Sequence, residues 1–164
     1  MHCYLLDYST NSLYNNIMKL KLLLLTFVTT ICYSADSTCP LMKGEENDPE
    51  ETASVEGKTL EFCCGSCVKQ FDANKAYYIR VIPQLNKQFT EDVKKKLGVD
   101  KIVPLKQTFC AIYSDRYINP NSTSAEYKGL TIRFWSSSAL RRWKRDPEKY
   151  YQEAVARGHL VPVK

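Results

Sequence analysis

Four cysteines in two short segments are the residues of this chain best suited to chemistry. Cys39 stands before a proline, and Cys63, Cys64 and Cys67 follow together further along the chain. Thiols grouped in this way bind a soft or borderline metal, pair as disulfides, or exchange electrons. Which of these three applies decides what the protein does.

A metal site formed by Cys39, Cys63 and Cys67 is the first interpretation. An extended strand that ends at Phe62 would deliver Cys63 at a turn, and Cys67 would fall in the first turn of the next helix. The unpaired N–H groups at a helix start stabilise a thiolate. Cys39 would return to them from a separate knuckle, as in small zinc modules that join a hairpin to a helix.

The fourth ligand of such a site stays open. Cys64 is the first candidate, and Met42 and a carboxylate from residues 45–51 are weaker ones. Four thiolates favour Zn²⁺, whereas thiolates with a thioether favour Cu(I). We therefore expect one Zn²⁺ or Cu(I) ion per chain.

Two other uses of the thiols remain as alternatives. A disulfide from Cys39 to Cys63 or to Cys67 would join the same hairpin to the same helix without any metal. The pair Cys64 and Cys67 also forms a Cys-x-x-Cys motif, which disulfide oxidoreductases use. The strand–helix–strand pattern of those enzymes is missing around it. Outside the cysteines, His159 is the only histidine of the mature chain and is expected to be solvated near a frayed C-terminus. No serine or carboxylate pair stands out, so no enzyme is expected.

The N-terminal sequence predicts export. A short basic segment and an apolar run make residues 18–35 a secretory signal peptide, with cleavage near Ser34 or Ala35. The run is shorter than the roughly 20 residues of a transmembrane helix, so no stable membrane span is expected in the mature form. Residues 1–17 are an upstream extension or a mis-assigned start. The mature chain, periplasmic or secreted, would keep five cysteines: Cys39, Cys63, Cys64, Cys67 and Cys110.

Composition places the chain among globular proteins and narrows its partners. The hydrophobic fraction is 44% and the charged fraction is 25%, with a net charge of +5. A basic run at 141–145 could contact phosphates, but nucleic acid is not an expected partner of an exported protein. The expected partner is a metal ion, with another extracytoplasmic protein as an open alternative.

The sequence repeats itself at an offset of 72 positions. Residues 57–62 lie over residues 129–134, and both segments alternate as a half-buried strand does. Aromatic residues then match, since Phe71 lies over Trp143 and Tyr78 over Tyr150. The second copy replaces the three clustered cysteines with Trp135, Ser136 and Ala139, and its Cys110 is expected to be a buried apolar residue or one half of a disulfide.

Local signals predict where helices begin in each copy. Ser136 or Ser137 is expected to cap a short helix, and Asp146 followed by Pro147 to start another that ends at Gly158. In the first copy Asn74 is expected to cap a longer helix that runs to about Leu97. Residues 99–109 are expected to form a linker with strand character.

The pattern of the first copy resembles the YHS domain and its TRASH-like relatives. The resemblance covers about 40 residues and consists of Cys39-Pro40, Gly57-Lys58, Phe62-Cys63, Cys67, Phe71 and Asn74 to Tyr78. It implies a small α+β module of a strand hairpin and helices that binds heavy metals through cysteines. It also implies two units in tandem, a cysteine-bearing one at 36–98 and a degenerate one at 99–164.

Overall fold

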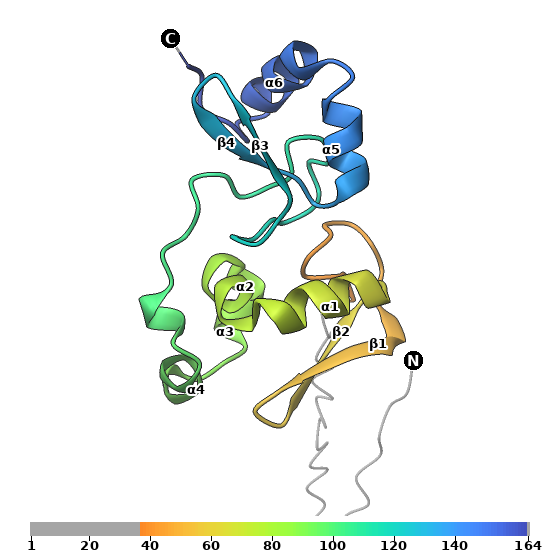
Figure 1. Cartoon of the computed structure of the whole chain (residues 1–164). Coiled ribbons are helices and arrows are strands. Elements are labelled where there is room, and N and C mark those ends of the chain that lie inside the picture. The colour runs from red at the N-terminus through yellow and green to blue at the C-terminus, as the bar shows by residue number, and fades with distance from the viewer. Residues whose placement is uncertain (1–36, 164) are drawn as a thin grey trace, which may run out of the picture. The chain divides into compact units, whose positions relative to one another are not determined.

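The computed structural model of this protein describes residues 37–163 (Figure 1). The expected upstream extension, signal peptide and cleavage site lie outside these residues. Two antiparallel two-stranded sheets and short helices make up the described chain, which agrees with the predicted α+β class. We refer to residues 37–98 as the first half and to residues 99–163 as the second half.

The first half is a hairpin followed by four short helices. Strand β1 (Asp48–Val55) pairs with β2 (Lys58–Phe62) across a two-residue turn at Glu56 and Gly57. Both turn residues have positive φ, of 48° and 80°, which the right-handed strand twist favours in a tight hairpin. The helices are α1 (Gly65–Ala73), α2 (Lys75–Val81), α3 (Pro83–Lys87) and α4 (Glu91–Lys96).

The second half has the same order of hairpin, short helix and second helix. Strands β3 (Ser124–Tyr127) and β4 (Leu130–Arg133) precede α5 (Ser137–Trp143) and α6 (Pro147–Ala156). The cap predictions are confirmed here, because the side chain of Ser136 accepts from Ala139 N–H and that of Asp146 accepts from Lys149 N–H.

Three local predictions for the middle of the chain are wrong. The expected long helix is broken into α2, α3 and α4, because Pro83 supplies no N–H and starts a new helix while Thr90 caps another. Asn74 precedes α2, but its side chain does not cap that helix. Residues 99–109 contain one 3-10 turn, Val99–Lys101, and no strand.

Two loops, each of which begins at a cysteine, pair with one another through their backbones. Cys39 N–H donates to Glu45 O at 2.8 Å, and Cys110 N–H donates to Arg116 O at 2.9 Å, so residues 39–45 and 110–116 close similar loops. We call them the first and second knuckles. Met42 and Arg116 form an antiparallel bridge between the knuckles.

Hydrogen bonds on both sides of that bridge extend the pairing. Lys43 N–H donates to Asp115 O at 2.8 Å, and Tyr117 N–H donates to Leu41 O at 3.0 Å.

Buried side chains add a second connection between the halves. Asn119 is 2% exposed, and its amide donates to Tyr78 Oη at 2.7 Å and to Gln70 Oε1 at 2.9 Å. The Gln70 amide in turn donates to Trp135 O at 3.1 Å. Helix α1 therefore contacts the second half through Gln70.

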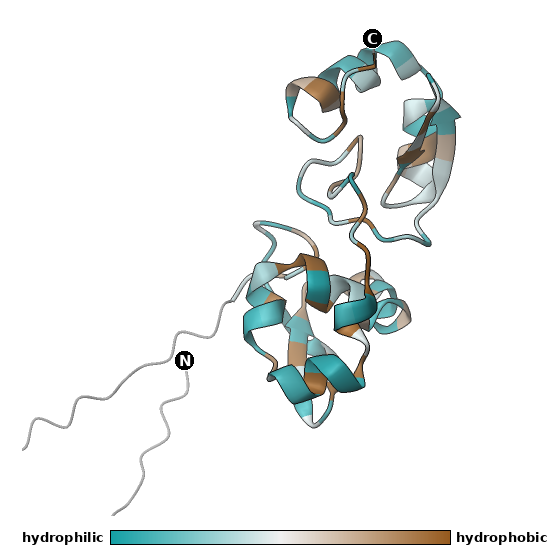
Figure 2. Cartoon of the chain, turned by 90° about the vertical axis from the view of Figure 1, so that its left-hand side faces the viewer, coloured by the Kyte–Doolittle hydropathy of each residue, from teal (hydrophilic) through white to brown (hydrophobic). Residues whose placement is uncertain are grey.

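Most buried residues are apolar, and most exposed residues are polar. Alternate hairpin residues such as Val55, Leu60 and Phe62 are buried, and the helices carry hydrophilic and hydrophobic residues in turn (Figure 2). Within residues 37–163, no helix combines the length and the apolarity needed to cross a membrane.

We predict that Asn119→Ala lowers the free energy of unfolding by about 1–3 kcal/mol, because it leaves the buried Tyr78 hydroxyl and Gln70 amide short of a partner. Urea denaturation measures the change. Asn121→Ala is the matched control, since the Asn121 side chain is exposed and its bond to Asn74 is solvent-accessible. Its effect should stay within about 0.5 kcal/mol. Equal effects of the two variants would contradict the buried network.

Candidate metal centre

Three cysteines from separate parts of the first half converge. The Sγ atoms of Cys39, Cys63 and Cys67 all lie within 4.8 Å of one another, which is close enough to hold a metal ion. Cys39 comes from the first knuckle, Cys63 directly follows β2, and Cys67 lies in the first turn of α1. The structure thus brings together three candidate ligands that the sequence analysis named, although Cys39 is distant from the other two along the chain.

Aromatic packing fixes the strand end and the helix that carry these thiols. Phe62 and Phe71 are fully buried, and their ring centroids lie 5.1 Å apart, so the end of β2 is held against α1. Between them Cys64 is extended and serves as the first carbonyl acceptor of α1, bonding Cys67 N–H at 3.0 Å. This bond places the Cys67 side chain beside Cys63.

The sulfur–sulfur distances are those of thiols around a shared centre. Cys63 Sγ lies 3.6 Å from Cys67 Sγ, and Cys64 Sγ lies 3.6 Å from Cys67 Sγ and 3.8 Å from Cys63 Sγ. Tetrahedral ligation with metal–sulfur bonds of about 2.3 Å implies sulfurs about 3.8 Å apart. A disulfide needs about 2.05 Å. Within residues 37–163, all five cysteines are free thiols.

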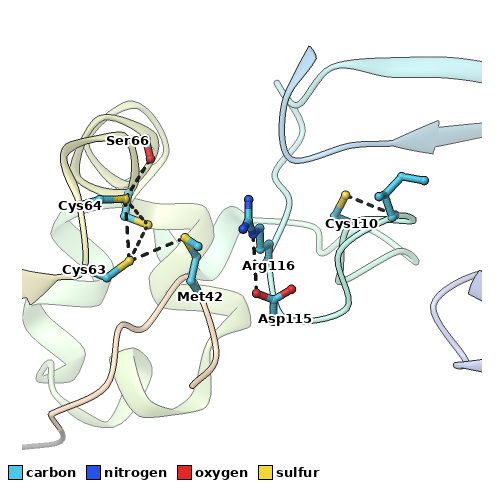
Figure 3. Close-up of polar contacts among 9 residues, drawn as sticks. Met42, Cys63, Cys64, Ser66, Cys110, Asp115 and Arg116 are labelled. Atoms are coloured by element: carbon cyan, nitrogen blue, oxygen red, sulfur yellow. Dashed lines mark hydrogen bonds and ion pairs between the residues drawn. The ribbon is translucent and has the colours of Figure 1, made fainter. Parts of the chain in front are cut away.

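Two further sulfur atoms lie against the group of three. Figure 3 shows Cys63 between Cys64 and Met42, whose Sδ is 3.7 Å from Cys63 Sγ. Cys64 is half-buried and bonds Ser66 Oγ at 3.0 Å, whereas Met42 is only 9% exposed. Both remain candidates for a fourth ligand. The sequence reasoning did not consider Ser66, although its position two residues after Cys64 was a visible signal.

The carboxylate candidate lies elsewhere. Among residues 45–51, Glu51 reaches the start of α1, where its Oε2 is 3.2 Å from the point that a Cβ on Gly65 would occupy. The close group of the described residues contains three cysteines and no carboxylate. A carboxylate ligand therefore has no geometric support here.

Hydrogen bonding and burial give the thiols different acidities. A hydrogen bond from the Cys67 thiol is the main cause that lowers the pKa of Cys39, from 9.0 to about 5. The same bond, followed by burial, raises the pKa of Cys67. Burial, followed by the bond to Cys39, raises the pKa of Cys63 to about 12. Of these three thiols, Cys39 is therefore the first to lose its proton.

Cys64 differs from the other thiols at the cluster. Burial alone would raise its pKa, but hydrogen bonds with Ser66 and Cys67 lower it by more than burial raises it, so that the net pKa falls. Cys63 and Cys64 are both half-buried, and of these two only Cys64 has a lowered pKa, which favours its reaction with reagents in solvent.

Cys110 and His159, which the sequence analysis also discussed, lie apart from the cluster. Cys110 is fully buried, as expected. Its sulfur accepts from Ile112 N–H at 3.4 Å (Figure 3). His159 was expected to be solvated at a frayed end. It is instead half-buried and packs on the Phe109 ring with centroids 5.2 Å apart.

Comparisons with known proteins find no matching family model, curated protein or solved structure.

We predict that the metal-free protein shows a first thiolate ionisation near pH 5, because the Cys67 and Cys63 thiols donate to the Cys39 thiolate. Ultraviolet absorbance of thiolate, followed against pH, measures this step. Cys39→Ser should abolish it, and Cys110→Ser should leave it unchanged. A first step at the ordinary cysteine value in the unaltered protein would contradict the hydrogen-bonded cluster.

The same shifts predict how metal-free stability depends on pH. The pKa of Cys39 is lowered on folding, so its contribution is complete above about pH 9 and is lost as the pH falls through 5. The pKa of Cys63 is raised on folding, so stability declines again above pH 9. Urea unfolding of unaltered and Cys39→Ser protein across this range should show a larger rise between pH 5 and 9 in the unaltered protein, because Cys64, whose pKa is also lowered, remains in the variant. A parallel rise in Cys39→Ser would contradict this assignment.

Proposed function

We propose that this is an exported, non-enzymatic binding protein that holds one thiophilic metal ion through Cys39, Cys63 and Cys67. One observation carries the proposal: thiols from two distant segments lie within 4.8 Å of one another without forming a disulfide. Thiolates arranged in this way select Zn²⁺ or Cu(I). Because two of the thiols are protonated in the metal-free state, loading the ion releases protons.

Cys64 is our proposed fourth ligand for Zn²⁺, and Met42 is the alternative that suits Cu(I). Support for Cys64 is its contact with both Cys63 and Cys67. Support for Met42 is that its side chain is buried and its Sδ contacts Cys63 Sγ. Zn²⁺ prefers four charged or nitrogen ligands, whereas a thioether is a good ligand for Cu(I).

The resemblance to YHS and TRASH-like modules agrees with this function. We propose that the two halves are related units, since helices α1 and α5 begin at Gly65 and Ser137, and α2 and α6 begin at Lys75 and Pro147. Each pair has the sequence offset of the repeat. The second half has Trp135 at the position of Cys63 and would serve to support the first knuckle rather than to bind metal.

Export remains part of the proposal and rests on the signal-peptide pattern at 18–35. In an oxidising compartment free thiols tend to pair, and a bound ion would keep these thiols from doing so. A disulfide-joined interaction module and a thiol–disulfide redox protein are the rival functions, and the metal assay separates them from this one.

We predict about one Zn²⁺ or Cu(I) per chain in protein purified without reductant or chelator. Elemental analysis measures the metal, and thiol titration should rise when chelator is added. Cys63→Ser and Cys67→Ser should each lose the metal because each removes a member of the close group. Cys110→Ser is the matched control and should keep it, since Cys110 lies apart.

Other outcomes of that assay assign the rival functions. Metal-free protein with one or two disulfides by mass, which refolds equally well with chelator, would contradict the proposal and support the disulfide module. A single reversible Cys64–Cys67 disulfide, with turnover of a disulfide substrate, would support the redox protein.

We predict that two substitutions separate the candidates for the fourth ligand. Met42→Leu keeps the buried volume and removes the thioether, so it should weaken Cu(I) binding by about tenfold and leave Zn²⁺ binding unchanged. Cys64→Ser should weaken Zn²⁺ binding more than Cu(I) binding. Competition with a colorimetric chelator measures both affinities. If neither substitution changes either affinity, both fourth-ligand assignments are wrong.

A further inference from the structure

The second half contains a pocket that the metal chemistry does not use. It has a volume of about 330 Å³ and is formed by three segments, 105–107, 129–133 and 158–161. These are the linker after the 3-10 turn, the turn and strand of the β3–β4 hairpin, and the chain after α6. The volume is in the range of pockets that hold small organic ligands.

The linker wall of this pocket is preformed. Gln107 is 7% exposed, and its side-chain amide pairs with the backbone of β4 as a neighbouring strand would. It accepts from Arg133 N–H at 2.8 Å and donates to Arg133 O at 2.7 Å. Both backbone polar groups of Arg133 are therefore held by the Gln107 side chain.

The C-terminal wall is held as well. Tyr151 is buried, and its hydroxyl donates to Val161 O at 3.2 Å and accepts from Val163 N–H at 2.7 Å. A ligand would thus meet walls that are already ordered, which lowers the entropic cost of binding.

The charge in the pocket has one sign. Its lining includes two cations, Lys106 and Arg133, and no acidic residue. Within residues 37–163, no ion pair involves either cation, and the buried Nε of Arg133 has no hydrogen-bond partner. A half-buried guanidinium without a partner favours an anion, and it matches a carboxylate through two parallel hydrogen bonds.

The remaining lining is mostly apolar. Leu105, Leu130 and Leu160 are half-buried, and Val161 is 56% exposed although it is a large hydrophobic residue. An apolar ligand group would cover Val161 and remove this surface from water. A strongly hydrated inorganic anion would gain nothing from these side chains.

We propose that this pocket binds a small organic carboxylate that carries an apolar chain. The carboxylate contacts Arg133 and Lys106, and the apolar chain lies against the leucines and Val161. The site is independent of the cysteines, because its three lining segments all belong to residues 105–161 of the second half. It gives the half that lacks the thiol cluster a binding function of its own.

Isothermal titration of the full chain with octanoate tests the proposal, with octanamide as the uncharged probe of the same length. We expect saturable binding of one octanoate per chain and no measurable binding of octanamide. Arg133→Gln should weaken octanoate binding by at least about tenfold, because a hydrogen bond to a charged partner is lost. Lys106→Gln, at an exposed position that the fold does not need, should weaken it several-fold.

Arg141→Gln is the matched control, since Arg141 is exposed on α5 and outside the pocket. It should bind octanoate as the unaltered chain does. The proposal is overturned if the unaltered chain shows no saturable octanoate binding, if octanamide binds equally well, or if Lys106→Gln and Arg133→Gln both keep the full affinity. Circular dichroism of each variant establishes that it is folded, and Lys106→Gln decides the matter if Arg133→Gln is not.

Discussion

The backbone pairing of the two knuckles is the constraint on which the candidate site depends. Cys39 is far from Cys63 and Cys67 in the sequence, so its loop must be held in place by something other than its neighbours. The hydrogen bonds of Lys43 to Asp115 in the second knuckle and of Leu41 to Tyr117 directly after it do this, with Met42 between them. Because Met42 also contacts Cys63, the pairing that holds the loop also places a sulfur atom at the cluster.

Helix α1 connects the same cluster to the core and to the second half. Cys67 faces the other thiols, Phe71 packs on Phe62, and Gln70 bonds the buried Asn119. A metal ion at the cysteines would thus hold one end of a helix whose middle is fixed by packing. Metal loading at such a site would add to folding stability.

The sequence predicted best the features that depend on neighbouring residues. Both hairpins turn at a glycine, and the caps at Ser136 and Asp146 follow from side chains next to the helix start. The prediction of one long helix was wrong because Pro83 interrupts it and starts a new helix. The pairing of the knuckles, the polar network at Asn119 and the burial of His159 all depend on contacts between distant segments. Periodicity and local propensity carry no information about such contacts.

The coordination shell of a bound metal shows most directly whether Cys39, Cys63 and Cys67 hold the ion. X-ray absorption spectroscopy at the metal edge reports which atoms surround the ion and at what distance. For protein loaded with Zn²⁺ we predict three or four sulfur neighbours at about 2.3 Å, and fewer sulfur neighbours in Cys67→Ser. A shell of nitrogen and oxygen alone, or one unaffected by Cys67→Ser, would contradict this prediction.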